Sequence, residues 1–97
     1  YTLVIGDAGK VVTMNNASAN TLTIPQNSGG GSPVAFPVGT TIIVEQIGAG
    51  QTTIAITTDT LNYSSPTSAG TCQTPGRYAA VTLFKRTSTV WDAWGAK

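Results

Sequence analysis

The chain has 97 residues, of which 9% are charged, and it carries a net charge of +1 with one cysteine and no histidine. This length suits one small domain, and the balanced charge excludes the long-range attraction that draws basic proteins to nucleic acid or membrane surfaces. No apolar run is long enough to span a bilayer. A lone cysteine cannot form an internal disulfide, and without histidine the usual zinc ligands and the usual base for a nucleophile are missing.

Charged residues are scarce beside the roughly 25% of ordinary globular proteins. The polar surface must therefore come from Thr, Ser, Asn and Gln, and Thr is the most frequent residue. Such a surface can pack against another protein without burying unpaired charges. This property favours subunit interfaces in virion-like or extracellular assemblies over an ordinary secreted β domain. The chain starts at Tyr1 and not at Met, so we expect a processed product or a piece of a longer protein.

The first part of the chain predicts three short strands. Residues 1–5 and 10–14 are predicted strands joined by a Gly- and Asp-containing turn. Residues 21–24 alternate in polarity, which places Leu22 and Ile24 inward. Residues 26–37 are rich in Gly and Pro and predict an exposed loop, with Phe36 anchoring its far end in the core.

Residues 41–57 predict a central hairpin, because two β-branched runs flank the short sequence Gly48-Ala49-Gly50. With Ile47 opposite Gln51, Val44 faces Ile54 and Ile42 faces Ile56, and these apolar residues share a core face. The other face of this hairpin is too apolar for free solvation, and we expect another part of the chain or another subunit to cover it in part. The candidate interface residues are Ile43, Glu45, Ile47, Thr53 and Ala55.

The last part of the chain continues the β pattern. Residues 60–63 predict a strand, and residues 64–76 predict a loop in which Cys72 is an unpaired structural thiol. Residues 77–86 and 89–94 predict a strand pair joined by a tight turn. No helical period and no internal repeat is evident. About eight short strands predict an all-β fold for one domain, residues 1–97: a small antiparallel β-sandwich, jelly-roll-like domain or barrel.

The sequence predicts no catalytic, cofactor or metal site. The acidic residues Asp7, Glu45, Asp59 and Asp92 fall in separate predicted elements, whereas glycosidases place two carboxylates roughly 5–9.5 Å apart around the scissile bond. The Gly-containing turns lack the spacing of a phosphate-binding loop and precede no helix. We therefore expect a protein that is not an enzyme and needs no cofactor.

Four aromatic residues are candidates for contact with a glycan or a protein partner: Tyr63, Tyr78, Trp91 and Trp94. Trp91 and Trp94 are three positions apart, so in one strand they point to opposite faces. We expect one of the two in the core and the other at a surface that binds a partner.

Four motifs together carry a family resemblance: Asp-Ala-Gly-Lys at 7–10, Met-Asn-Asn-Ala-Ser-Ala-Asn-Thr-Leu-Thr-Ile-Pro at 14–25, Phe-Pro-Val-Gly-Thr at 36–40 and Gln-Ile-Gly-Ala-Gly-Gln-Thr-Thr at 46–53. The chain resembles the C-terminal module of tailed-bacteriophage virion proteins of the tail-fibre, head-decoration or head-fibre type. The late strand with Trp91 and Trp94-Gly95 fits the end of that module. The segments 29–33 and 64–76 depart from it.

The resemblance implies a non-enzymatic structural protein on the surface of a phage virion, trimeric and in contact with copies of itself and with other virion proteins. A tail-fibre or spike-type module would attach the particle to a host receptor such as a surface glycan. A capsid decoration (cement) or head-fibre protein would stabilise the phage head. A third possibility is a carbohydrate-binding module of a secreted enzyme, which requires an exposed aromatic platform. The lack of paired carboxylates disfavours a depolymerase.

Overall fold

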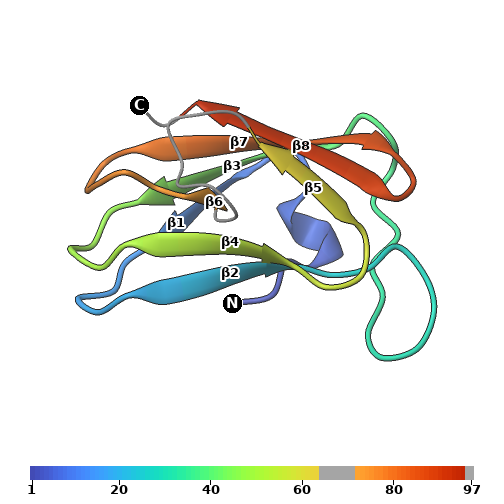
Figure 1. Cartoon of the computed structure of the whole chain (residues 1–97), viewed down its shortest axis with the longest axis horizontal. Helices are drawn as coiled ribbons and strands as arrows, with labels where there is room; N and C mark the ends of the chain where they lie inside the picture. Colours follow the sequence, from blue (N-terminus) through green and yellow to red (C-terminus); the bar gives the residue numbers. More distant parts are fainter. Residues whose placement is uncertain (64–71, 96–97) are drawn as a thin grey trace.

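The structure is a computed structural model that describes residues 1–63 and 72–95. Its strands are β1 (Val11–Met14), β2 (Asn20–Ile24), β3 (Thr41–Gln46), β4 (Thr52–Ile56), β5 (Thr60–Tyr63), β6 (Cys72–Gln73), β7 (Ala80–Thr87) and β8 (Val90–Gly95). They form a five-stranded sheet with the order β1-β3-β7-β8-β5 and a three-stranded sheet with the order β2-β4-β6 (Figure 1). The predicted all-β sandwich is confirmed.

The core lies between the two sheets and follows the alternation of each strand. In β3, Ile42 and Val44 are fully buried while their neighbours face outward, and the same pattern places Leu22 and Ile24 of β2 inward as predicted. Phe36, which was expected to anchor the long loop, is buried and its ring meets the ring of Trp91 edge to face at 5.6 Å. The buried apolar side chains form a single cluster: Leu3, Met14, Leu22, Ile24, Phe36, Ile42, Val44, Ile54, Cys72, Val81, Leu83, Trp91 and Ala93.

The predicted central hairpin is wrong. Strands β3 and β4 belong to different sheets, and residues 47–51 carry the chain from one sheet to the other. β3 pairs with β1 and β7, and β4 pairs with β2 and β6, so the expected backbone pairing of Val44 with Ile54 does not occur. Ile42, Val44 and Ile54 nevertheless face the core, because alternation gives the same inward face in either arrangement.

Three such crossings stack at one end of the sandwich, where the chain passes between sheets at residues 15–19, 47–51 and 74–79 (Figure 1, left side). We call these crossings the arches. Val11 pairs with Ile43 and Asn20 with Thr52, both in parallel, so the first strand–arch–strand unit recurs with a constant offset of 32 residues. The structure thus contains an internal repeat that the sequence did not reveal, and its sheets are mixed where antiparallel pairing was expected.

Other local predictions were partly right. The pair β7–β8 is antiparallel as expected, with an irregular register between Lys85 and Thr87. Residues 1–5 form no full strand: Thr2 bridges to Thr23, and a short 3₁₀ helix, η1 (Ile5–Asp7), follows. Cys72, expected in a loop, lies in β6, is buried, and is a free thiol whose pKa burial raises to about 11. Residues 64–71 of that predicted loop lie outside the described residues.

Candidate functional site

The outer face of the five-stranded sheet carries aromatic and polar side chains in registered rows. One row runs Val11, Ile43, Thr82 and Trp94 across β1, β3, β7 and β8. The next row runs Thr41, Phe84, Asp92 and Asn62 and ends on β5. The β1–β3 half of this face carries the apolar pair Val11 and Ile43 among threonines and Glu45, and the β8–β5 half combines an aromatic side chain with polar groups.

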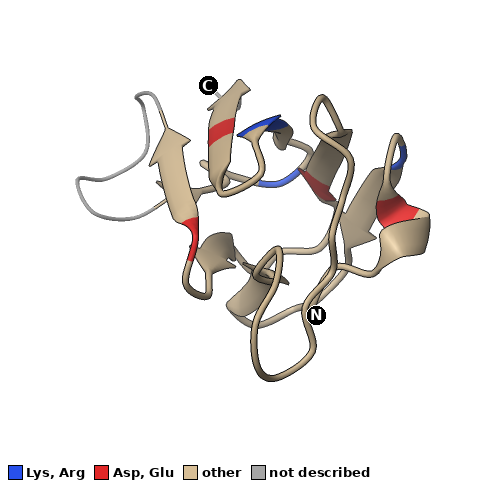
Figure 2. Cartoon of the chain, turned by 90° about the vertical axis from the view of Figure 1, so that its right-hand side faces the viewer, with Lys and Arg blue, Asp and Glu red and all other residues tan. Residues whose placement is uncertain are grey.

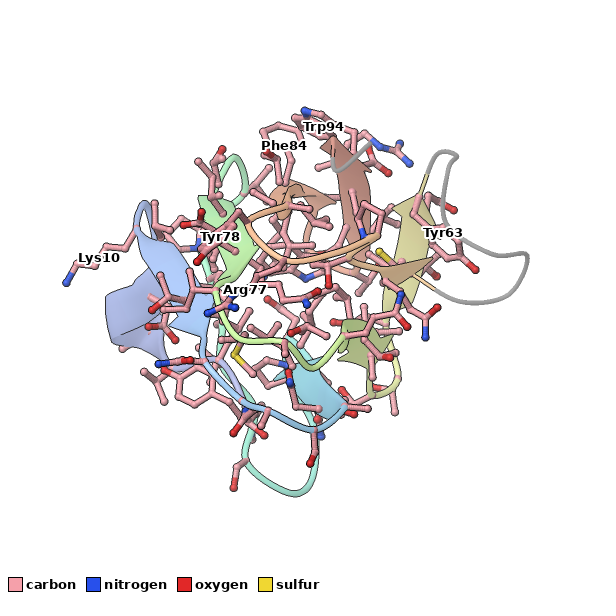
Figure 3. The ribbon with its side chains drawn as sticks, turned by 90° about the vertical axis from the view of Figure 1, so that its left-hand side faces the viewer. Lys10, Tyr63, Arg77, Tyr78, Phe84 and Trp94 are labelled. Atoms are coloured by element: carbon pink, nitrogen blue, oxygen red, sulfur yellow. The ribbon has the colours of Figure 1, made fainter. Side chains whose placement is uncertain are left out.

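Trp94 is the central side chain of the polar half. It is 46% exposed, and its ring lies 6.0 Å from the ring of Phe84 in a tilted arrangement. Figure 3 shows the two rings side by side at the top of the molecule. A half-exposed indole supported by a second ring presents a flat apolar surface that needs no rearrangement to accept a ligand.

Asp92 sits beside this platform and joins three strands through hydrogen bonds. Arg86 Nε donates to Asp92 Oδ2 at 2.7 Å, and Asn62 Nδ2 donates to Asp92 Oδ1 at 3.3 Å. The hydrogen bond from Arg86, assisted by the one from Asn62, lowers the pKa of Asp92 below its ordinary value. The carboxylate is therefore ionised at neutral pH, which suits an acceptor of ligand hydroxyls and does not suit a general acid.

Beside Asp92 and Trp94 lies a shallow groove of about 320 Å³, which we call the Trp94 groove. It is lined by Asn62, Tyr63, Asp92, Ala93 and Trp94. An aromatic wall with a carboxylate, an amide and a guanidinium beside it matches what a pyranose offers, since a sugar has an apolar ring face and a rim of hydroxyls. A larger pocket of about 500 Å³ is lined by Ile54, Ile56, Leu61, Cys72 and neighbouring residues and contains no charged side chain.

The four aromatic candidates do not form one site, and Figure 3 shows Tyr78 apart from Tyr63 and Trp94. Trp91 is 1% exposed and belongs to the core, so it has no surface left for a ligand, while Trp94 points outward, which confirms the predicted opposite faces. Tyr63 packs partly against the core and borders the Trp94 groove. Tyr78 is 65% exposed on the third arch, where its backbone has φ of 68° and the Arg77 guanidinium lies 5.1 Å from its ring centroid.

The five candidate interface residues also separate, because the hairpin that was to unite them does not exist. Ile43 and Glu45 lie on the outer face of the five-stranded sheet, and Ile47 lies in the second arch. Thr53 and Ala55 lie on the outer face of the three-stranded sheet, on the opposite side of the sandwich.

Acidic residues do not converge in the part of the chain that the structure describes. Figure 2 shows the charged residues dispersed around the molecule. Asp7 ends η1, Glu45 lies in β3, Asp59 precedes β5 and Asp92 lies in β8. Residues 1–63 and 72–95 contain no group of three potential metal ligands, and no helix among them is long and apolar enough to cross a bilayer.

Sequence reasoning identified Trp94 but not the polar residues around it. Asp92 and Trp94 are two apart on one strand, and alternation alone places them on the same face. Arg86 and Asn62 come from other strands, and only the registers of β7–β8 and β5–β8 bring them to Asp92.

Comparison with known proteins identifies no relative: no family model, curated protein or solved structure matches the chain.

Proposed function

We propose that this chain is a non-enzymatic module of a phage virion surface that binds a host glycan through the Trp94 groove. The observation that carries the glycan part is the half-exposed Trp94 beside the ionised Asp92, held by Arg86 and Asn62. The virion part is supported by the motifs at 7–10, 14–25, 36–40 and 46–53 and by the scarcity of charge. A tail-fibre or spike-type module would account for both the glycan binding and the place on the virion.

Binding to purified host lipopolysaccharide and capsular polysaccharide tests the glycan proposal. We expect Trp94→Ala to weaken binding at least ~10-fold, since truncating a tryptophan at the centre of a binding site typically costs about 2 kcal/mol or more and a tenfold loss is about 1.4 kcal/mol. Tyr78→Ala is the matched control, because it removes another exposed aromatic ring outside the groove and should leave binding unchanged. Equal affinity of Trp94→Ala and the unaltered protein would reject the groove as the binding site.

We also expect no hydrolysis of these polysaccharides. The described acidic side chains lie in separate elements, and the low pKa of Asp92 deprives it of the proton that a general acid must deliver. Incubation with the same glycans should release no reducing ends. Release that disappears in Asp92→Asn or Asp59→Asn would overturn the non-enzymatic proposal.

A capsid decoration or head-fibre role is the second candidate, and the apolar pair Val11 and Ile43 on the same sheet face favours it. Val11 is 55% exposed and adjoins Ile43, so this half offers a surface for another virion protein. A cryo-EM map of the particle separates the two roles: density on the shell supports decoration, and density at a tail fibre supports attachment. A carbohydrate-binding module of a secreted enzyme would bind the glycan equally well and be absent from the particle.

A further inference from the structure

Lys85 is a lysine inside the core. It occupies an inward-facing position of β7 and is 1% exposed. Its Nζ lies 6.0 Å from the ring centroid of Trp91, and the ring of Phe36 packs against the same indole. Burying an ammonium in such apolar surroundings costs several kcal/mol unless strong hydrogen-bond or charged partners compensate for the lost water. The groups around Nζ must therefore supply that compensation or keep the amine neutral.

The groups that meet Nζ are neutral oxygens. Lys85 Nζ donates to Asn27 Oδ1 at 2.6 Å and to the Phe36 carbonyl oxygen at 2.7 Å. Asn27 begins the long loop after β2, and its backbone N–H donates to Asp59 Oδ2 at 2.9 Å. The Lys85 amine and the Asn27 carboxamide thus meet beside two aromatic rings, and the Asp59 carboxylate is bound to the backbone of the same asparagine.

We propose that Lys85 and Asn27 become joined by an intramolecular isopeptide bond. The Lys85 amine attacks the carboxamide carbon of Asn27, the new C–N bond forms, the bond from that carbon to the amide nitrogen breaks, and one molecule of ammonia leaves. Asp59 takes the proton that the lysine releases and returns a proton to the departing nitrogen. No oxidation occurs and no cofactor is consumed.

The distance between Lys85 Nζ and the Asn27 carboxamide carbon is close to a reacting distance. A C=O bond is about 1.23 Å long, so the Asn27 carboxamide carbon lies no more than about 3.8 Å from Nζ. Reacting atoms in near-attack arrangements are roughly 3–3.5 Å apart, and two groups held this way react as if at very high local concentration. The hydrogen bond to Oδ1 also polarises the carbonyl toward attack.

Burial shifts Lys85 toward the neutral amine. Burial lowers the pKa of Lys85, against an opposing effect of the Asp59 charge, and a neutral amine is the nucleophile that the reaction needs. Phe36 and Trp91 keep water from the new amide, which protects it from hydrolysis. The bond would tie the loop after β2, a strand of the three-stranded sheet, to β7 in the middle of the other sheet.

The intact mass of the full chain, measured under denaturing conditions, tests the proposal. We expect a mass lower than that of the sequence by one ammonia. Asn27→Ala and Lys85→Arg should restore the sequence mass, and Asp59→Ala should restore it while keeping both reacting residues. Asn62→Ala, which removes an asparagine on the outer face of the five-stranded sheet while Lys85 points into the core, should keep the deficit. A sequence mass for the unaltered protein would overturn the proposal, whatever the variants do.

Tryptic digestion locates the bond. The basic residues that bound the relevant peptides are Lys10, Arg77, Lys85 and Arg86. We expect residues 11–77 covalently joined to 78–86, because trypsin does not cleave after an acylated lysine. A cyclised Asn27 would lose the same ammonia without any link. A lighter but linear 11–77 peptide together with free 78–85 would therefore refute the isopeptide bond.

Discussion

Gly50 lies where two arches touch, and this contact explains why glycine stands there. A Cβ on Gly50 would lie 2.0 Å from the Ser18 carbonyl oxygen, and a Cβ on Gly48 would lie 2.4 Å from the backbone of Asn16. The Gly50 N–H donates to the Asn16 carbonyl oxygen at 2.8 Å, so the second arch is hydrogen-bonded directly onto the first. Neither glycine is needed for a hairpin turn, which was the reason that sequence alone suggested.

We expect Gly50→Ala to lower the free energy of unfolding by about 3 kcal/mol or more, because the obstructing atoms are backbone and cannot rotate away. Gly30→Ala is the matched control, since its Cβ would meet nothing within 4 Å. That variant should stay within about 0.5 kcal/mol of the parent. Urea denaturation measures both, and equal midpoints for the two variants would contradict the stacked arches.

At the scale of elements, a buried polar network binds the second arch to the third. Thr74 Oγ1 donates to Gln46 Oε1 and accepts from the Thr52 backbone N–H at 3.1 Å. Gln46 Nε2 in turn donates to the Gly48 carbonyl oxygen at 3.0 Å. All three side chains are buried, so their hydrogen bonds compensate for the loss of water at this end of the sandwich.

Thr74→Val tests this network because valine keeps the shape of threonine without its hydroxyl. The change leaves Gln46 Oε1 and the Thr52 N–H without the partner they have now. We expect a loss of about 1–3 kcal/mol in the free energy of unfolding for each buried group that stays unpaired. Thr13→Val, on the exposed side of β1, should change stability little. Thermal unfolding of both variants gives the comparison.

At the scale of the whole molecule, we predict a homotrimer, with the number three taken from the resemblance to phage fibre and decoration proteins. Of the two outer faces that carry the candidate interface residues, the five-stranded sheet is the better choice because exposed Val11 adjoins Ile43 there. A ring of three would repeat one such patch around an axis. Ile43→Glu should then dissociate the trimer by placing a charge in the interface.

Light scattering coupled to size exclusion measures this outcome. Ala55→Glu is the matched control, since it places the same charge on the outer face of the three-stranded sheet. A monomeric mass for the unaltered protein at micromolar concentration rejects the trimer. A trimer that survives Ile43→Glu and dissociates with Ala55→Glu assigns the interface to the other sheet.

The sequence by itself determined most of the strands and which side of each faces the core, although it placed a strand at residues 1–5 and missed β6. Leu22 and Ile54 are buried where alternation placed them, and alternation also set Trp91 and Trp94 on opposite faces, while the structure decided that Trp91 is the buried one. This information is local, because a side chain's face depends only on its position along its own strand.

The tertiary structure alone decided which strands are neighbours. Backbone N–H and C=O groups are the same in every residue, so β-branched runs such as β3 and β4 pair equally well in a hairpin or in separate sheets. Packing two sheets around one core favoured the separate sheets, and this choice stacked Gly50 on Ser18. The same choice of neighbours brought Arg86 and Asn62 to Asp92, and Asn27 to Lys85. Both proposed sites depend on residues that are distant in sequence, and only the assembled sandwich brings them within reach of one another.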